Sequence, residues 1–108
     1  MNKATTLLRG RIYSAKLSGI EGEKYFLVVS NNKRNQHLPQ ALAVRITTSA
    51  KPAMPSIIAL SANEPLTGNV ICDDIIELYP DEIRRDLGAL SPETMERVNA
   101  GLRAALGL

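Results

Sequence analysis

Short apolar segments separated by turn-forming residues make up most of this chain, and they constrain its fold more than any other feature. Residues 11–17 and 24–30 predict two strands on either side of a glycine-rich loop, and residues 42–48 predict a third. Further strands are predicted at residues 56–61 and 69–72, and residues 75–79 continue as strand or bend. Such short strands favour a small, strongly bent sheet or barrel.

The end of the chain carries the one long helical pattern. Ser91 supplies an N-cap hydroxyl, Pro92 fits the first helical position, and Glu93 places an acid in the first turn. Apolar residues then recur at helical spacing, at Met95, Val98, Leu102, Ala105 and Leu106. We therefore expect an amphipathic helix over residues 92–106, and a short helical turn within residues 81–86.

Length and composition bound the class of protein. With 108 residues, of which 44% are hydrophobic, we expect residues 1–108 to form one domain, in which residues 1–8 lack turn or periodicity and are poorly ordered. One Cys and one His exclude an internal disulfide and the usual Cys/His zinc site within one chain, and we expect a buried thiol at Cys72. No motif of metal or nucleotide type and no glycine-rich phosphate loop is present, so we expect no cofactor. No apolar run reaches the roughly 18 residues of a membrane helix, and a signal-peptide core is lacking, which favours a cytoplasmic protein without membrane contact.

The net charge of +2 hides an uneven distribution. Residues 1–51 hold nine Lys and Arg against two Glu, a net charge of +7, whereas residues 52–108 hold four Arg against nine acidic residues, a net charge of −5. The chain therefore has a basic half and an acidic half. Aromatic residues make up only 4% of the chain and Trp is absent, which argues against recognition by a wide aromatic stacking platform.

The third predicted strand, residues 42–48, contains the first candidate site. Alternation along it gives one face Leu42, Val44 and Ile46 and the other face Ala43, Arg45 and Thr47. Arg45 and Thr47 therefore project together, and we expect Lys24 across from them on a neighbouring strand. Attack on a phosphodiester by the adjacent 2′-hydroxyl needs a cation to neutralise the phosphorane oxygens and a hydroxyl to position the phosphate. The alternative is a solvated strand face with an ordinary surface Arg and Thr.

The polar segment of residues 31–37 is predicted to be a loop and is the second candidate site. Basic and amide side chains on a loop suit contacts to phosphates and base edges of unpaired RNA, and the candidates here are Lys33, Arg34, Asn35 and His37. A plain solvated loop is the alternative. Asp73 and Asp74 are adjacent and would point to opposite faces of a strand, so we expect them to end a strand rather than to bind a cation.

The order of several segments resembles the MazF/PemK family of toxins. The opening match is Arg9-Gly10-Arg11-Ile12-Tyr13, then a loop of glycines and acids, then Leu27-Val28-Val29-Ser30-Asn31. The next match is Val44-Arg45-Ile46-Thr47-Thr48-Ser49, and the last begins at Leu87-Gly88-Ala89-Leu90-Ser91 and continues to Gly107-Leu108. The similarity runs from about Arg9 to Leu108, so it covers nearly the whole chain.

The resemblance implies a mainly β fold, a small SH3-like barrel of the CcdB/MazF type with a C-terminal α-helix, assembled as a homodimer. It also implies a metal-independent endoribonuclease that cuts single-stranded RNA at short sequences and is blocked by a cognate antitoxin. The catalytic threonine of the family carries over onto Thr47, and Thr48 and Ser49 follow it as RNA contacts. Where the family has Arg-Pro this chain has Lys24-Tyr25, which keeps the charge but loses the planar guanidinium, so we expect Arg45 to supply the guanidinium and Lys24 to assist.

The resemblance also explains the uneven charge distribution. The basic half would supply a groove for RNA, and an acidic tail of the antitoxin would compete with RNA for this groove. Two alternatives differ from this function. One is a CcdB-like poison of DNA gyrase, but those toxins end in a Trp-containing tail that this chain lacks. The other is a cleavage-dead relative that binds RNA or an antitoxin only, which Lys24 at the arginine position leaves open.

Overall fold

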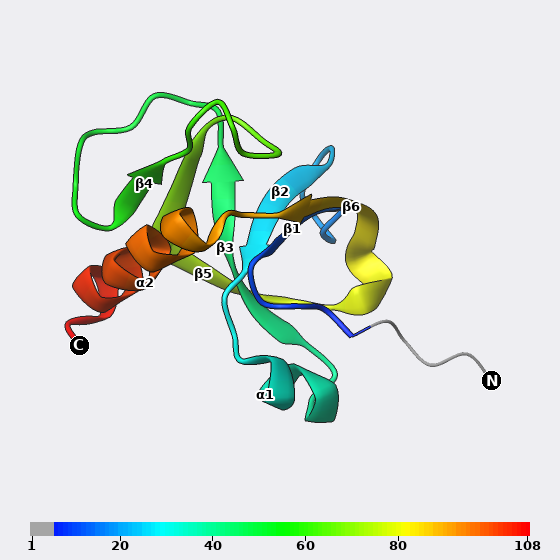
Figure 1. Ribbon diagram of the computed structural model, residues 1–108. Coiled ribbons are helices and arrows are strands. Elements are labelled where there is room, and N and C mark those ends of the chain that lie inside the picture. Colours follow the sequence, from blue (N-terminus) through cyan, green and yellow to red (C-terminus); the bar gives the residue numbers. More distant parts are fainter. Residues whose placement is uncertain (1–5) are drawn as a thin grey trace.

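The computed structural model describes residues 6–108, which fold into one six-stranded antiparallel sheet with two helices (Figure 1). The elements in chain order are β1 (Arg11–Ala15), β2 (Lys24–Val28), α1 (Asn32–His37), β3 (Ala41–Thr47), β4 (Ile57–Ala59), β5 (Asn69–Leu78), the 3₁₀ turn η1 (Pro80–Glu82), β6 (Ile83–Ala89) and α2 (Pro92–Leu106). The strands lie in the order β4-β5-β3-β2-β1-β6. The mainly β fold with a C-terminal helix is thus confirmed.

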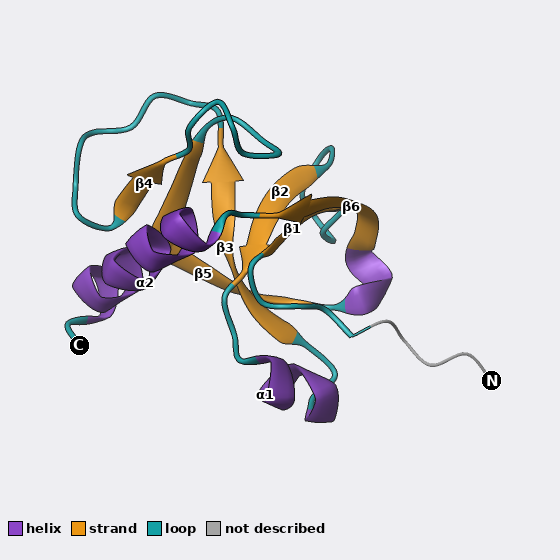
Figure 2. Ribbon diagram, in the orientation of Figure 1, coloured by secondary structure: helices purple, strands orange, loops and turns teal. Residues whose placement is uncertain are grey.

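The sheet has an apolar core on each of its two faces. On one face lies the helix-side core, beneath α2, which packs against β5 and β4 (Figure 2). Its buried members are Ile12, Leu27, Val44, Ile46, Ile58, Val70, Cys72, Leu90 and Val98. On the other face the bent strands enclose the barrel core, with Leu7, Tyr13, Ala15, Phe26, Val28, Ala41, Ala43 and Leu78. The two sets confirm the alternation predicted along β3, in which Val44 and Ala43 face opposite ways.

A bulge lets β5 contribute to both cores. Against β3, Ile71 pairs with Arg45 but Ile75 pairs with Val44, so the residues between them have no partner in the register. The insertion reverses the faces, because Cys72 belongs to the helix-side core whereas Leu78 belongs to the barrel core. The prediction that Asp73 and Asp74 end a strand is therefore wrong: both lie inside one strand of ten residues.

Two other elements differ from the predictions. Residues 31–37 were predicted as a loop, but six of them form α1, whose first turn is capped by the Asn31 side chain accepting from Lys33 N at 2.8 Å. A helix this short has no apolar stripe from which a sequence pattern could reveal it. The predicted helical turn at residues 81–86 is limited to η1, and the rest is the edge strand β6, in which a run of charged residues hides the strand pattern.

The predicted helix at residues 92–106 is confirmed with the same bounds. Ser91 Oγ accepts from Thr94 N at 3.2 Å, and Gly107 ends the helix in a left-handed conformation. The helix approaches β5 closely where Gly101 faces Cys72, since a Cβ on Gly101 would lie 2.8 Å from Cys72 Sγ. Cys72 is fully buried, as expected. Within residues 6–108, no helix has the length and apolar character that crossing a membrane requires.

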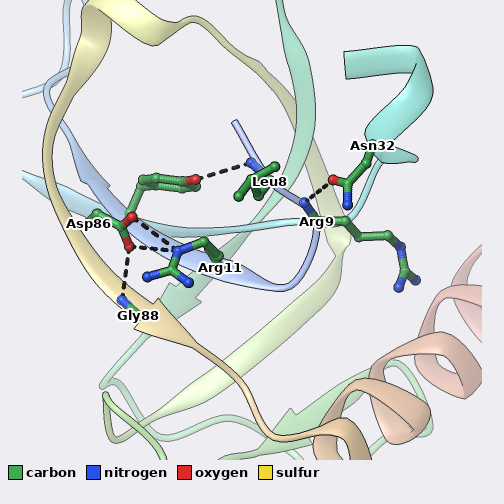
Figure 3. Close-up of polar contacts among 7 residues, drawn as sticks. Leu8, Arg9, Arg11, Asn32, Asp86 and Gly88 are labelled. Atoms are coloured by element: carbon green, nitrogen blue, oxygen red, sulfur yellow. Dashed lines mark hydrogen bonds and ion pairs between the residues drawn. The ribbon is translucent and has the colours of Figure 1, made fainter. Parts of the chain in front are cut away.

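The chain segment before β1 is held in place by its backbone, by the buried Leu7 side chain and by the Arg9 guanidinium, whose Nε donates to Val29 O at 3.0 Å. Leu7 is buried in the barrel core, Leu8 N donates to the Tyr13 hydroxyl at 3.1 Å, and Arg9 N donates to Asn32 Oδ1 at 2.7 Å (Figure 3). In the same view, Arg11 forms an ion pair with Asp86 across β1 and β6. Poor order is expected over residues 1–8; residues 1–5 lie outside the described residues, whereas Leu7 and Leu8 make the contacts given above.

Candidate active site

Lys24, Arg45 and Thr47 lie on one face of the sheet at the same end of β2 and β3, and are called the Thr47 cluster below. In the register of these strands Phe26 pairs with Arg45 and Tyr25 pairs with Ile46, so the continuing register sets Lys24 opposite Thr47. Side chains paired across antiparallel strands project to the same face. The arrangement agrees with the placement predicted from the sequence.

Among residues 6–108, the cations of the Thr47 cluster have no acidic partner. The Arg45 side chain is half-buried, and its Nε is shielded from solvent without a hydrogen-bond acceptor among residues 6–108. Two ion pairs form among residues 6–108, and both lie outside the cluster. They join Arg11 with Asp86 and Arg85 with Glu23. The part of the guanidinium that remains exposed therefore carries a positive charge that an anionic ligand can neutralise.

The Thr47 hydroxyl lies at the point where β3 ends. Its Oγ1 accepts a hydrogen bond from Ser49 N at 3.2 Å, and both Thr48 and Ser49 are exposed. Two residues that the sequence analysis missed contact this segment: Gly68, whose backbone touches the Thr47 carbonyl, and Asn69, whose side chain donates to Ser49 O at 3.4 Å. The turn-forming pair Gly68-Asn69 is visible in the sequence, but its contact with Thr47 depends on the fold.

The residues predicted on the 31–37 segment lie at the opposite end of β3, because α1 precedes the first residue of that strand and Thr47 is its last (Figure 1). A strand of seven residues spans about 20 Å. Lys33 and His37 are exposed on α1. The structure therefore does not bring the α1 residues and the Thr47 cluster together.

Asn35 is buried, and Arg34 is half-buried and bound to a backbone carbonyl. Asn35 is only 6% exposed, and its Nδ2 donates to Leu7 O at 3.2 Å and to Ser30 O at 3.1 Å, while its Oδ1 accepts from Ser30 Oγ at 2.6 Å. Arg34 Nη1 donates to Gln40 O at 2.9 Å. Asn35 therefore holds the N-terminal segment and the β2–β3 connection together, and its amide is not presented to a ligand.

A surface depression of about 490 Å³ lies where the end of β1 meets η1. It combines one cation with two carboxylates, and its lining residues are Lys16, Leu17, Ser18, Tyr79, Asp81 and Glu82. None of the predicted site residues lines it. No group of three or more His, Cys, Asp or Glu side chains suited to a metal ion is found within residues 6–108.

Comparison with known proteins places the chain in a family. Residues 8–106 match the model of the PemK-like, MazF-like toxin of type II toxin-antitoxin systems. The chain is 43% identical over 101 residues to endoribonuclease MazF1 of Mycobacterium bovis and to endoribonuclease MazF4 of Mycobacterium tuberculosis, which covers 94% of this chain and 93% of each relative.

Solved structures agree with this assignment. An endoribonuclease in complex with its cognate antitoxin, from a mycobacterial species, superposes with a TM-score of 0.87 at 42% identity, covering 94% of this chain and 96% of that one. At 23% identity, MazF in the MazE–MazF structure from Deinococcus radiodurans has the same fold, with a TM-score of 0.80 over 96% of this chain and 98% of that one. This chain belongs to the PemK/MazF toxin family of type II toxin–antitoxin systems.

Proposed function

We propose that this chain, an endoribonuclease toxin of the PemK/MazF family, cleaves single-stranded RNA at the Thr47 cluster without a metal ion. The observation that carries the proposal is the half-buried guanidinium of Arg45, which lies on the same face as the Thr47 hydroxyl and has no acidic partner among residues 6–108. A phosphate group bound beside it would accept hydrogen bonds from the exposed part of the guanidinium. The ammonium of Lys24, across from Thr47 in the register, adds a second positive charge.

The reaction is a transesterification within the RNA. The 2′-oxygen forms a bond to phosphorus while the bond from phosphorus to the 5′-oxygen breaks. One proton leaves the 2′-hydroxyl and one is taken up by the departing 5′-oxygen, so the ends are a 2′,3′-cyclic phosphate and a 5′-hydroxyl. In this scheme Arg45 and Lys24 stabilise the charge that builds on the phosphorane oxygens, and the Thr47 hydroxyl donates to one of them.

RNA contacts extend from the Thr47 cluster in this proposal. Thr48 and Ser49 are exposed directly beside it, so they are placed to bind the nucleotides that flank the cut. Lys33 and His37 would form a second contact area on α1, reached by a longer RNA. Asn35 supports this second area from inside rather than by touching RNA, and Arg34 has its Nη1 bound to Gln40 O.

The partners follow from the same charges. A relative 42% identical to this chain has been solved with its cognate antitoxin, which supports an antitoxin partner here. We expect an acidic antitoxin segment to compete with RNA for Lys24 and Arg45. We further propose that residues 1–108 form one toxin domain, that two copies assemble as a homodimer, and that the protein acts in the cytoplasm, where its RNA substrate is found.

The test is cleavage of a long unstructured RNA by the purified protein in excess EDTA. Discrete cuts with 2′,3′-cyclic phosphate ends are expected. Salt-sensitive binding without cuts would instead indicate a cleavage-dead relative, and neither cuts nor binding would indicate a protein target such as gyrase. Either result overturns the proposed activity.

Variants of the same protein test the roles of the two cations. Arg45→Ala should lower the cleavage rate about 100-fold or more, Arg45→Lys should restore part of it, and Lys24→Ala should have a smaller effect. Arg103→Ala removes an exposed arginine on α2 and is the matched control. If Arg45→Ala cleaves normally while Lys24→Ala does not cleave, the division of labour between them is wrong.

A further inference from the structure

The connection between β4 and β5, residues 60–68, ends in a close contact with Thr47. Gly68 has a φ of +129°, and a Cβ built on it would lie 2.5 Å from Thr47 O and 3.1 Å from Thr47 C. Backbone can approach backbone this closely only where there is no side chain. The Gly68 carbonyl in turn accepts from Leu60 N at 2.9 Å, so the turn is held on both sides.

Asn69 continues this contact beyond the end of β3. It pairs with Thr47 in the register, and its Nδ2 donates to Ser49 O at 3.4 Å. Ser49 N donates in turn to Thr47 Oγ1. Because one lone pair of the hydroxyl oxygen is taken by Ser49 N–H, the hydroxyl hydrogen is directed away from it and is free to be donated to a ligand.

The other part of the connection is anchored at the N-terminus of α2. The Glu64 carboxylate accepts from Ser91 N at 3.0 Å, from Ser91 Oγ at 2.7 Å and from Thr94 Oγ1 at 2.5 Å. Burial alone would raise the pKa of Glu64, but the hydrogen bonds from Thr94 and Ser91, with the nearby charge of Arg97, hold it below its ordinary value. The connection is thus a brace between α2 and the end of β3.

We propose that Gly68 and Asn69 are positioning residues for the Thr47 hydroxyl, an inference that rests on the proposed function of the Thr47 cluster. Neither residue touches the substrate. Gly68 fixes the backbone of Thr47 by contact, and Asn69 fixes Ser49, whose N–H orients the hydroxyl. A displacement of about 1 Å at a reacting group can cost up to about 100-fold in rate, so the brace affects the chemical step rather than the binding of RNA.

The first experiment measures kcat and KM on a single-stranded RNA oligonucleotide that contains a mapped cut. Asn69→Ala should lower kcat by about 10-fold with KM within about twofold of the parent, because only the hydroxyl loses its orientation. Asn63→Ala removes an exposed amide from the same connection and should leave both constants unchanged. Gly68→Ala should lower kcat more than Asn69→Ala, since its new Cβ pushes on the Thr47 backbone.

Gly10→Ala is the control for stability alone. Gly10 also has a positive φ, of +89°, but a Cβ there would meet only Met95 at 3.8 Å, and Gly10 lies away from the Thr47 cluster. Equal losses of kcat in Gly68→Ala and Gly10→Ala at matched unfolding temperature would overturn the role of Gly68. A rise in KM without a fall in kcat for Asn69→Ala would overturn the role of Asn69.

A double-mutant cycle separates this inference from the proposed function. In a Thr47→Ala background, Asn69→Ala should lower kcat no further, because the group that it positions is already gone; additive losses would contradict the inference. If Thr47→Ala alone cleaves normally, the proposed function of the cluster fails instead. Amide hydrogen exchange at Ser49 then still reports the contact itself: faster exchange in Asn69→Ala supports the brace, and unchanged exchange refutes it.

Discussion

The two ends of β3 both carry polar and basic side chains, but the structure uses them differently. At the α1 end, Asn35 and Arg34 donate to backbone carbonyls and hold the N-terminal segment and the β2–β3 connection together. At the other end, Lys24 and Arg45 have no acidic partner among residues 6–108, and Arg45 Nε lacks an acceptor. Sequence composition ranks both ends as candidate RNA contacts, whereas the hydrogen bonds show which side chains are still available to a ligand.

The largest expected effect lies at the Thr47 end. Thr47→Val keeps the shape of the side chain and removes only the hydroxyl, and we expect it to lower the single-turnover cleavage rate about 100- to 1,000-fold. The Arg45 guanidinium remains in place, so RNA affinity should change little. Unchanged cleavage in Thr47→Val would mean that the hydroxyl does not take part in the reaction. The two ends of β3 would then no longer differ in catalytic role.

At the α1 end the corresponding change should affect folding and not cleavage. Asn35→Ala leaves the Leu7 and Ser30 carbonyls without their donor in a buried place, and should lower the free energy of unfolding by about 1–3 kcal/mol. Chemical denaturation measures this, with the exposed neighbour Gln36→Ala as control. Cleavage per folded molecule should match the parent; a selective loss of cleavage in a stable Asn35→Ala protein would contradict the structural role.

The brace at Glu64 predicts a pH dependence of stability. Because the pKa of Glu64 is lowered from its ordinary value of 4.5 in the folded protein, its contribution is complete above that value and is lost as the pH falls through the lowered folded pKa. Glu64→Gln should cost about 1 kcal/mol at neutral pH and should flatten the stability curve below pH 4.5. An unaltered curve would show that the carboxylate is not ionised against Ser91 and Thr94.

The smallest effect is expected from the exposed cation of α1. Lys33→Ala should weaken RNA binding by less than about 1 kcal/mol and reduce the slope of log affinity against log salt by about one, with kcat unchanged. For the parent, affinity should fall steeply between low and physiological salt. A flat salt response would argue against phosphate contacts at both ends, and a large loss of kcat in Lys33→Ala would make α1 part of the reactive site.

Sequence reasoning succeeded where local patterns decide the structure. The cap at Ser91 and the spacing of Met95 and Val98 located α2, and the period of two in β3 set Arg45 and Thr47 on one face. It failed where distant contacts decide. The buried position of Asn35 depends on the carbonyl of Leu7, and the importance of Gly68 depends on a carbonyl twenty-one residues earlier in the chain. No local pattern contains that information.

The contact between α2 and β5 makes Cys72 a natural reporter of how readily α2 separates from the sheet. The chain has one cysteine, and its thiol lies fully buried beneath Gly101, where even one added carbon would lie 2.8 Å from the sulfur. Burial, with a smaller effect of neighbouring Asp73, raises the pKa of Cys72 to about 11, so the docked thiol is unreactive at neutral pH. A small thiol reagent can label Cys72 only when the packing around it opens, as it does when α2 lifts from the sheet. The labelling rate therefore reports the free energy of this local opening without any engineered probe.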